Sequence, residues 1–430
     1  MSNFNTKEPE IRNVTRKELQ ATFVKNKGCR ICDSTRLYAF LELGPQPPAN
    51  SFLSKDQLLT EERFYPLTIY FCEDCGLVQL RDIISPEVLF KHYVYLTGMS
   101  QTMKEHFYSV AAEIVEDFNL GKNDLVIDIG SNDGSLLNGF KQLGTQTLGI
   151  EPATNVALIA EANGIETIND FFSFDVSNNI IEKKGHAKVI IGTNVFGHVN
   201  DLHEFLKVVD SLLAHDGIFI VEVPYLVDLL SKTEFDTIYH EHLSYFSVRP
   251  LVTLFKSFNM ELFNVKRVKV HGGTIRCYIR KEATEINESV HSLLRLEEDL
   301  KLGLRKTYSE FGDKTKQIRI KLNDLLSELK NKGCRIVGYG ASAKGNVLLN
   351  YCKIGTDILD YVLDNTPLKQ GLFTPGTHIP VQPPSRLLQD TPDYVLVLAW
   401  NHLNEILMKE QEYRKFGRKF IVPIPEPRII

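Results

Sequence analysis

The chain has 430 residues, of which 43% are hydrophobic and 24% are charged, and its formal net charge is −5. This composition excludes a disordered or collagen-like chain, and at roughly 150 residues per domain it predicts about three domains. The balanced charge gives no reason to expect nucleic-acid binding. The polar N-terminus shows no signal peptide, and no stretch is apolar for long enough to span a membrane. We therefore expect a soluble, cytoplasmic protein with neither nucleic-acid nor membrane partners.

After a polar leader over residues 1–27, two C-x-x-C pairs indicate a zinc site. The pairs are Cys29 with Cys32 and Cys72 with Cys75. Four thiolates suit tetrahedral zinc and close its coordination shell, so the metal is expected to be structural in a small module over residues 28–98. The alternatives are core thiols or a redox pair. A redox C-x-x-C normally lies at the turn of a βαβ unit, and neither pair is surrounded by that pattern.

Alternating helix and strand signals over residues 99–280 predict a doubly wound parallel sheet. Expected helices cover residues 101–118, 135–144, 155–164 and 202–217, and expected strands cover residues 125–130, 147–151, 188–194 and 218–224. Two further strand-like runs, 261–270 and 274–281, are joined by so short a link that they must pair antiparallel. A parallel sheet that ends in such a hairpin is typical of S-adenosylmethionine methyltransferases.

Residues 281–430 predict a charged helical connector followed by a second α/β unit. The connector covers residues 282–332. The second unit has expected strands over 334–340, 358–364 and 394–400 and expected helices over 343–352 and 402–417. Its block GYGASAKGN places glycines after a strand and Lys344 at a helix N-terminus, which suits a diphosphate or a bound NAD.

The first turn of the central sheet predicts a cofactor site. Asp128 ends a buried strand, Gly130 and Gly134 frame a tight turn, and Glu151 ends the next strand, where a carboxylate can accept ribose hydroxyls. An NAD site would need G-x-G-x-x-G, whereas this turn reads G-S-N-D-G. The pattern therefore favours S-adenosylmethionine. The complete expected set is Asp128, Gly130, Asn132, Asp133, Gly134, Glu151, Pro152 and Asn194.

A cluster of protic side chains follows the fifth strand. Tyr239, His240, Glu241 and His242 are consecutive, but H-E-H lacks the spacing of a common metal site. Proton transfer fits better, because imidazole titrates near neutral pH and a neighbouring carboxylate can raise its basicity. The competing interpretation is a structural polar turn. Tyr93 and Tyr95, in YVYLTGMS, could close the cleft or could be core aromatics.

Taken together, these blocks resemble a known family. CRIC…CEDC, LGPQPPANSF, YVYLTGMS, IDIGSNDG, GIEP, YHEHLSYFS, HGGT, YGASAKGN and AWN occur in the order found in the three-domain sugar C-methyltransferases, from about residue 28 to the C-terminus. The resemblance implies an N-terminal zinc module, a central class I (Rossmann-like) S-adenosylmethionine domain and a C-terminal Rossmann-like domain that holds a nucleotide sugar. HGGT replaces the commoner HGGS and keeps the hydroxyl.

The resemblance also implies residue roles. The base is expected at His242, supported by Glu241, Tyr239, Tyr93 and His198, whereas His240 is left out. Expected substrate-binding residues are Tyr95, Tyr225, His271, Gly340, Ser342, Lys344, Asn346 and Asn401. The implied substrate is a dTDP- or GDP-linked 4-keto-deoxyhexose, methylated at C3 through an enolate by a monomeric enzyme. The alternatives are an NAD-dependent oxidoreductase, an O- or N-methyltransferase and a zinc scaffold for nucleic acid.

Overall fold

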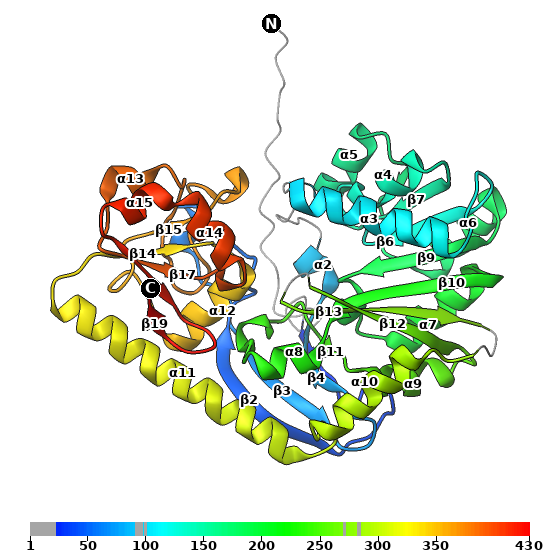
Figure 1. Cartoon of the computed structure of the whole chain (residues 1–430), viewed down its shortest axis with the longest axis horizontal. Coiled ribbons are helices and arrows are strands. Elements are labelled where there is room, and N and C mark those ends of the chain that lie inside the picture. The colour runs from blue at the N-terminus through cyan, green and yellow to red at the C-terminus, as the bar shows by residue number, and fades with distance from the viewer. Residues whose placement is uncertain (1–22, 91–97, 99–100, 270–271, 282–284) are drawn as a thin grey trace, which may run out of the picture.

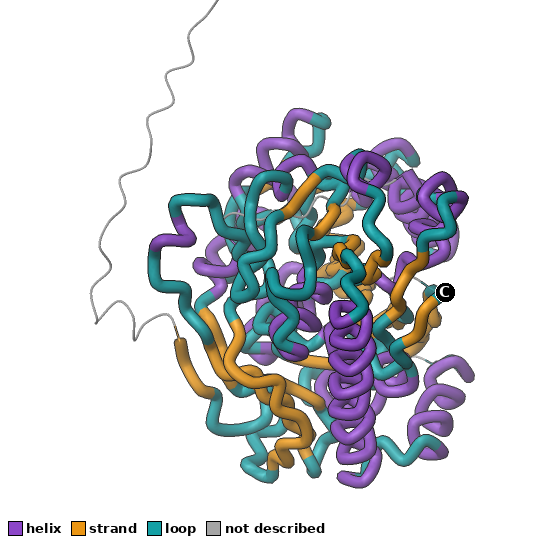
Figure 2. Tube along the Cα trace, turned by 90° about the vertical axis from the view of Figure 1, so that its left-hand side faces the viewer, coloured by secondary structure: helices purple, strands orange, loops and turns teal. Residues whose placement is uncertain are grey.

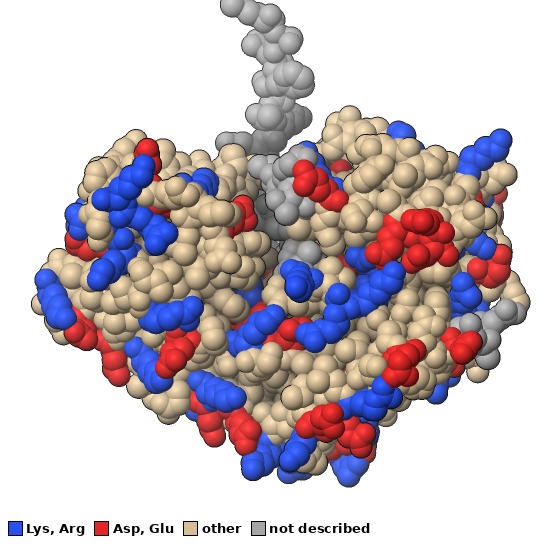
Figure 3. Space-filling view, in the orientation of Figure 1, with Lys and Arg blue, Asp and Glu red and all other residues tan. Residues whose placement is uncertain are grey.

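The computed structural model describes residues 23–90, 98, 101–269, 272–281 and 285–430. In Figure 1 the C-terminal domain lies on the left, the central domain lies on the right, and the zinc module extends below and between them. Acidic and basic side chains are interspersed on the face shown in Figure 3. Within the described ranges, no helix is both long enough and apolar enough to cross a bilayer.

The central domain has a seven-stranded sheet in the order β12-β13-β10-β9-β6-β7-β8. The strands are β6 (Leu125–Ile129), β7 (Gln146–Ile150), β8 (Thr167–Ile168), β9 (Ala187–Thr193), β10 (Leu213–Pro224), β12 (Glu261–Val268) and β13 (Thr274–Arg280). β13 runs antiparallel to both of its neighbours, and the pairs from β10 to β8 are parallel. The predicted parallel sheet with a terminal antiparallel hairpin is confirmed.

Helices cover both faces of this sheet (Figure 1). They are α3 (Gln101–Asp117), α4 (Ser135–Gln142), α5 (Thr154–Ala162), α6 (Phe174–Lys184), α7 (Leu202–Leu212), α8 (Leu226–Ser231) and α9 (Val248–Lys256). The predicted helix over 202–217 ends earlier, at Leu212, because Leu213 already pairs with Ala187 of β9. The helices α6, α8 and α9 and the short strand β8 were not predicted from the sequence.

The zinc module is built on β2 (Leu37–Gln46), β3 (Tyr65–Cys72) and β4 (Val78–Leu80), which pair antiparallel. A fourth strand, β11 (Ser244–Tyr245), comes from the YHEHLSYFS block of the central domain and pairs with β4. A separate pair joins β1 (Phe23–Lys25) to β5 (Asp82–Ile84), and α2 (Pro86–Phe90) follows. The sheet of the zinc module is therefore completed by the central domain.

The C-terminal domain has a six-stranded sheet in the order β16-β15-β14-β17-β18-β19. Its elements are β14 (Ile336–Tyr339), α12 (Ala343–Cys352), β15 (Val362–Leu363), β16 (Val381–Gln382), α13 (Arg386–Asp390), β17 (Tyr394–Val397), α14 (Leu403–Lys409), α15 (Gln411–Lys415), β18 (Lys419–Val422) and β19 (Arg428–Ile429). The strands from β16 to β18 are parallel, as predicted for an α/β unit. The expected helix over 402–417 is divided at Glu410.

The predicted connector forms two helices, α10 (Glu288–Asp299) and α11 (Arg305–Asn331). In the side view of Figure 2, α11 is the long helix that faces the viewer. It packs against the zinc module, where the Tyr308 ring lies 4.2 Å from that of Phe71 and 5.1 Å from that of Phe40. Gly312 allows this close approach, because a Cβ there would lie 2.5 Å from the Phe40 carbonyl oxygen. The connector thus tethers the C-terminal domain to the zinc module.

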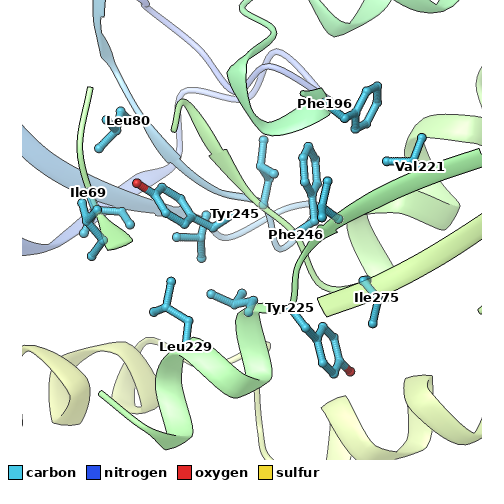
Figure 4. Close-up of a cluster of buried hydrophobic side chains, with 14 of the residues drawn as sticks. Ile69, Leu80, Phe196, Val221, Tyr225, Leu229, Tyr245, Phe246 and Ile275 are labelled. Carbon is cyan, nitrogen blue, oxygen red and sulfur yellow. The ribbon is translucent and has the colours of Figure 1, made fainter. Parts of the chain in front are cut away.

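One hydrophobic core extends through all three domains. Its buried members include Ile69 and Leu80 of the zinc module, Phe196 and Val221 of the central domain and Leu396 of the C-terminal domain. Figure 4 shows how Tyr245 and Phe246 bring the segment after YHEH into the part of this core between the first two domains. Full burial of a side chain such as Phe246 contributes about 1.5–3 kcal/mol to stability, so the packing of these two domains against each other is strongly favourable.

Candidate active site and zinc centre

The four cysteines of the zinc module converge on one point. Their Sγ atoms all lie within 4.8 Å of one another, with Cys29 and Cys75 at 3.4 Å and Cys32 and Cys72 at 3.6 Å. Ligands about 2.3 Å from a tetrahedral zinc would be roughly 3.8 Å apart, so the cluster fits this metal. Each pair is followed by a residue with positive φ, Asp33 or Gly76, which turns the chain back. The predicted four-thiolate zinc centre is therefore supported by the geometry.

Arg30 links this centre to the YHEH segment. It lies between the first two cysteines, and its side chain is buried. Its guanidinium group donates hydrogen bonds to the carbonyl oxygens of Leu80 and Leu243, and to Asn200 Oδ1 at 3.3 Å. Burial lowers the pKa of Arg30 to about 10, so the side chain stays charged at neutral pH. The zinc loop thus orders two segments of the central domain.

The predicted cofactor turn lies at the carboxyl ends of β6 and β7. Gly130 and Asn132 both have positive φ, and a Cβ at Gly130 would lie 2.4 Å from Val195 Cγ2. Glu151 accepts hydrogen bonds from the backbone N–H groups of Asn132 (2.9 Å) and Ala153 (2.8 Å), one on each oxygen. A carboxylate has about four acceptor sites, so capacity remains for two ribose hydroxyls.

Asp128 is buried beside this turn, and its Oδ1 atom has no hydrogen-bond partner among the described residues. Burial, reinforced by the charge of Glu151, raises the pKa of the Asp128 carboxyl group well above its usual value. An ammonium donor would satisfy the unpaired oxygen and stabilise its charged form. The turn therefore fits the amino acid and ribose parts of S-adenosylmethionine.

The other predicted cofactor residues lie around the same turn. Asp133 accepts hydrogen bonds from Gly98 N at 2.6 Å and from Ser135 Oγ at 2.7 Å, and so holds Gly98 next to the first turn of α4. Gly134, with φ of 76°, precedes the first residue of α4. Pro152 follows Glu151 and is partly buried, and Asn194, with φ of 60°, comes directly after β9. The fold brings the whole predicted set together, and the individual contacts stay predictions.

Replacement of Glu151 by glutamine should weaken S-adenosylmethionine binding by roughly 10- to 100-fold, the value of one hydrogen bond to a charged group. Burial raises the pKa of Glu151, so the affinity of the native protein should begin to fall at a higher pH than for an exposed glutamate. Calorimetric titration of each variant measures this effect. Glu161→Gln, an exposed position on α5, is the matched control, and equal affinities of the two variants would contradict the assignment.

The YHEH segment lies where the zinc module meets the central sheet. Leu243 N donates to the carbonyl oxygen of Gly197 at 2.8 Å, and Leu80 N donates to that of Leu243 at 2.9 Å. These bonds place the segment next to the loop that carries His198, after β9. Residues far apart in sequence thus form one cluster.

His242 is held in a defined tautomer. Its Nδ1 atom lies 2.8 Å from the carbonyl oxygen of Thr237. Because a carbonyl oxygen can only accept, Nδ1 carries the proton, and in the neutral ring Nε2 carries the lone pair. The ring lies 3.9 Å from that of Tyr239 and 5.1 Å from that of His198, which stacks in turn on Phe90. The rings of three predicted catalytic residues therefore lie in one cluster, in which His242 stacks on His198 and is tilted against Tyr239.

The other histidines nearby are neutral. Burial lowers the pKa values of His198 and His240 to about 4. His240 is fully buried, with Nε2 3.2 Å from the Pro66 carbonyl oxygen, so it supports the loop, which agrees with leaving it out of the catalytic set. Tyr93 lies outside the described residues.

Glu241 has a partner that the sequence analysis missed. Asn50, from the PPANSF block of the zinc module, donates from Nδ2 to Glu241 Oε1 at 2.7 Å. The only sequence signal was that Asn50 lies within a block that matches the family, because its partner is distant along the chain. The roles of Thr237 and Arg30 were not predicted for the same reason. The Thr237 carbonyl contacts His242, and Arg30 donates to the carbonyls of Leu80 and Leu243, and these contacts form only in the folded chain.

Lys344 was expected to hold a diphosphate, but the fold places it between two carboxylates of the central domain. Its Nζ atom lies 3.1 Å from Glu234 Oε2 and 3.7 Å from Asp236 Oδ1, and 4.9 Å above the Trp400 ring. Asp236 also accepts from Trp400 Nε1 at 2.7 Å. A substrate phosphate would therefore compete with two carboxylates for the Lys344 ammonium group. In the structure, Lys344 joins the C-terminal domain to the central domain through these two ion pairs.

The neighbouring residues of the AKGN block have structural contacts too. Ser342 Oγ accepts from Gly345 N at 3.1 Å and caps α12, and Asn346 donates from Nδ2 to the Ala49 carbonyl oxygen at 2.7 Å. Gly340 has positive φ, and a Cβ there would lie 2.5 Å from Ala399 Cβ. Their predicted contacts with substrate stay predictions.

Asn401 lines a cavity of about 520 Å³ between the central and C-terminal domains. Its wall also contains Lys232, Glu234, Trp400 and Arg428. The Trp400 ring could stack on a base, and Lys232 and Arg428 could pair with a phosphate, whereas the carboxylate of Glu234 would oppose a phosphate placed next to it.

The structure corrects one expectation. Tyr225 was predicted to bind substrate, but its side chain is buried in the hydrophobic core between domains (Figure 4). Its hydroxyl donates to Glu297 Oε1 of α10 at 2.9 Å, and burial raises its pKa. A tyrosine with its hydroxyl already paired in the core is not available to a substrate. Tyr95 and His271 lie outside the described residues.

Comparisons with known proteins agree with this architecture. Family models match the chain as a zinc binding domain over residues 29–90, a methyltransferase domain over 103–265 and a C-methyltransferase C-terminal domain over 269–425. The C-methyltransferase NovU of Streptomyces niveus is 39% identical over 404 residues, which cover 94% of this chain and 96% of that protein.

Two further comparisons cover only part of this chain. A ubiquinone biosynthesis O-methyltransferase of Rhodopseudomonas palustris is 30% identical over 100 residues, covering 22% of this chain and 38% of that protein. The solved structure of an S-adenosylmethionine-dependent methyltransferase from Clostridium acetobutylicum has a TM-score of 0.34 at 14% identity, covering 42% of this chain and 92% of its own. The full-length match to NovU and the three ordered domain models show that this chain belongs to the family of S-adenosylmethionine-dependent C-methyltransferases with an N-terminal zinc-binding domain.

Proposed function

We propose that this C-methyltransferase methylates C3 of a nucleoside-diphosphate-linked 4-keto-deoxyhexose, with His242 as the base that forms the enolate. The observation that carries the proposal is the Nδ1 contact of His242 with the Thr237 carbonyl oxygen. Because that contact keeps the proton on Nδ1, Nε2 is the basic nitrogen. Methylation of an oxygen or nitrogen would not require a base arranged to form an enolate.

The ketone makes the hydrogen on C3 acidic, and transfer of that proton to His242 Nε2 leaves the electron pair shared between C3 and the ketone oxygen. Hydroxyl groups, with Tyr239 and Tyr93 as the proposed donors, stabilise the negative charge on this oxygen. Glu241 supports the cation that forms on the imidazole. The neutral rings of His198 and Phe90 limit the access of water beside the base. S-adenosylmethionine, when bound, supplies an electrophilic methyl group to the carbon.

Residues of this chain also account for substrate placement. Glu151 and Asp128 would hold the cofactor at the end of β6, and the cavity beside Trp400 and Asn401 would hold the nucleotide. We propose that the sugar extends from this cavity toward the YHEH segment. The chain would then act by bringing C3 and the methyl group within about 3–3.5 Å in the correct orientation.

Incubation of the protein with S-adenosylmethionine and a dTDP- or GDP-linked 4-keto-6-deoxyhexose tests this function. The expected product carries a new methyl group on C3, identified by NMR. Without cofactor, the C3 hydrogen should exchange with solvent deuterium. A methyl group on the other carbon beside the ketone would agree with an enolate mechanism but would show that C3 is not the methylated position. A product methylated on oxygen would overturn the proposal.

A further inference from the structure

The PPAN turn, residues 47–50, is a tight turn of the zinc module at the junction of the three domains. It follows β2, and Ser51 N donates to the Pro48 carbonyl oxygen at 3.1 Å. The two prolines have fixed φ angles, and both are buried together with Ala49. The turn therefore offers a rigid backbone from which Asn50 projects.

The C-terminal domain holds one side of this turn. Asn346 of α12 is fully buried, and its Nδ2 atom donates to the Ala49 carbonyl oxygen at 2.7 Å. The backbone oxygen of Asn346 accepts from Asn350 Nδ2 at 2.8 Å, and Asn350 also donates to the Pro375 carbonyl oxygen at 3.0 Å. The contact with the turn thus belongs to an ordered network within the C-terminal domain.

The other side of the turn reaches the central domain. Asn50 Nδ2 donates to Glu241 Oε1 at 2.7 Å, and Glu241 is 2% exposed. A hydrogen bond to a buried carboxylate is stronger than one between neutral groups, and it fixes the orientation of the carboxylate. The C-terminal domain thus holds the backbone carbonyl of Ala49 in the turn. The side chain of the next residue, Asn50, holds the Glu241 carboxylate of the central domain.

From this juxtaposition we infer that Asn50 is a positioning residue for Glu241 and that Asn346 acts through the PPAN turn to keep Asn50 in place. The inference rests on the proposed function, in which Glu241 supports the base. It assigns Asn346 to the assembly of the catalytic segment and not to direct contact with substrate. It also gives the C-terminal domain a part in catalysis in addition to the nucleotide binding proposed above.

The test compares Asn50→Ala, Asn346→Ala, Glu241→Gln and the double variants of Glu241→Gln with each of the first two. Asn50→Ala should lower kcat, and the rate of deuterium exchange next to the ketone without cofactor, by roughly 10- to 100-fold. Asn346→Ala removes a neutral hydrogen bond and should lower both by roughly 2- to 10-fold. KM should stay within about twofold for each. Ser51→Ala, at the exposed neighbouring position, is the matched control and should keep native rates.

The double variants show whether the effect passes through Glu241. If it does, Asn50→Ala combined with Glu241→Gln should be no slower than Glu241→Gln alone, because the carboxylate to be positioned is already absent. The same should hold for Asn346→Ala combined with Glu241→Gln. Thermal unfolding of every variant identifies those that lose the fold, and kcat is compared between folded variants. If Asn346→Ala does not fold, the Asn50 variants still decide the first half of the inference.

Three results would overturn the inference while leaving the proposed function intact: native rates in Asn50→Ala, multiplicative losses in the double variants, or a raised KM with native kcat in Asn346→Ala. The last result would instead place Asn346 against the substrate. If the native protein neither methylates nor exchanges any nucleotide-linked keto-sugar, the proposed function itself fails, and the inference fails with it.

Discussion

Replacement of His242 by alanine should lower kcat by roughly 10²- to 10⁴-fold, because positioned proton transfer contributes about this much to catalysis. The affinity for S-adenosylmethionine should not change, since the cofactor turn is formed by other elements, β6 and β7. The lone pair on Nε2 exists because Nδ1 donates to Thr237, and the variant removes the nitrogen without removing the backbone that surrounds it.

Two measurements separate a catalytic loss from a structural one. Deuterium exchange at the carbon beside the ketone, without cofactor, should fall in parallel with kcat, and calorimetry should show native cofactor binding. His291→Ala, an exposed histidine on α10, is the control and should retain both rates. Equal loss of turnover and cofactor binding in His242→Ala would mean that His242 is structural, and unchanged exchange would remove it as the base.

Removal of zinc should lower both the thermal stability and the activity of the protein. Cys72 ends β3 and Cys75 lies in the turn before β4, which pairs with β11 immediately after the YHEH segment. Without the metal, the cysteines would take up protons and nothing would hold the two C-x-x-C turns together, so this edge of the sheet would loosen. Metal-free protein and the variant Cys75→Ser should unfold at a temperature lower by roughly 10 °C or more, since each lost kcal/mol lowers Tm by about 4–8 °C in a domain of roughly 60–100 residues, the size of the zinc module.

Activity should decline in proportion to the zinc removed and return when zinc is added back. Metal analysis should find one zinc ion per native chain and a large reduction in Cys75→Ser. Cys334→Ser is the control, because Cys334 lies outside the four-thiol cluster. Arg30→Lys should retain zinc but reduce activity, since a lysine cannot donate to Asn200 and to two carbonyl groups in the same planar arrangement. Full activity in the metal-free protein would show that the zinc centre and the YHEH segment are independent.

Local patterns in the sequence predicted most of the long helices and strands of the two α/β domains and the four-cysteine cluster, but they did not reveal α6 or β8. The two C-x-x-C spacings were enough to predict that the four cysteines form one metal site. A tetrahedral zinc ion needs four ligands, and two C-x-x-C pairs can supply them even when the pairs are far apart in the chain. The periodicity around Asp128 and Glu151 placed both at the ends of neighbouring parallel strands, whose carboxyl ends meet at one edge. The short joint at Gly272 and Gly273 required the antiparallel hairpin, because so few residues cannot cross a sheet.

Only the tertiary structure decided which partners these residues have. The tautomer of His242 depends on the Thr237 carbonyl, the orientation of Glu241 on Asn50, and the charge around Lys344 on Glu234 and Asp236. Tyr225 was expected to bind substrate, yet it lies in the core, where its hydroxyl donates a hydrogen bond to Glu297 of α10. The sequence determines which groups are able to ionise, donate or coordinate. Long-range packing determines which of them meet, because contacts between residues far apart in the chain leave no local periodicity.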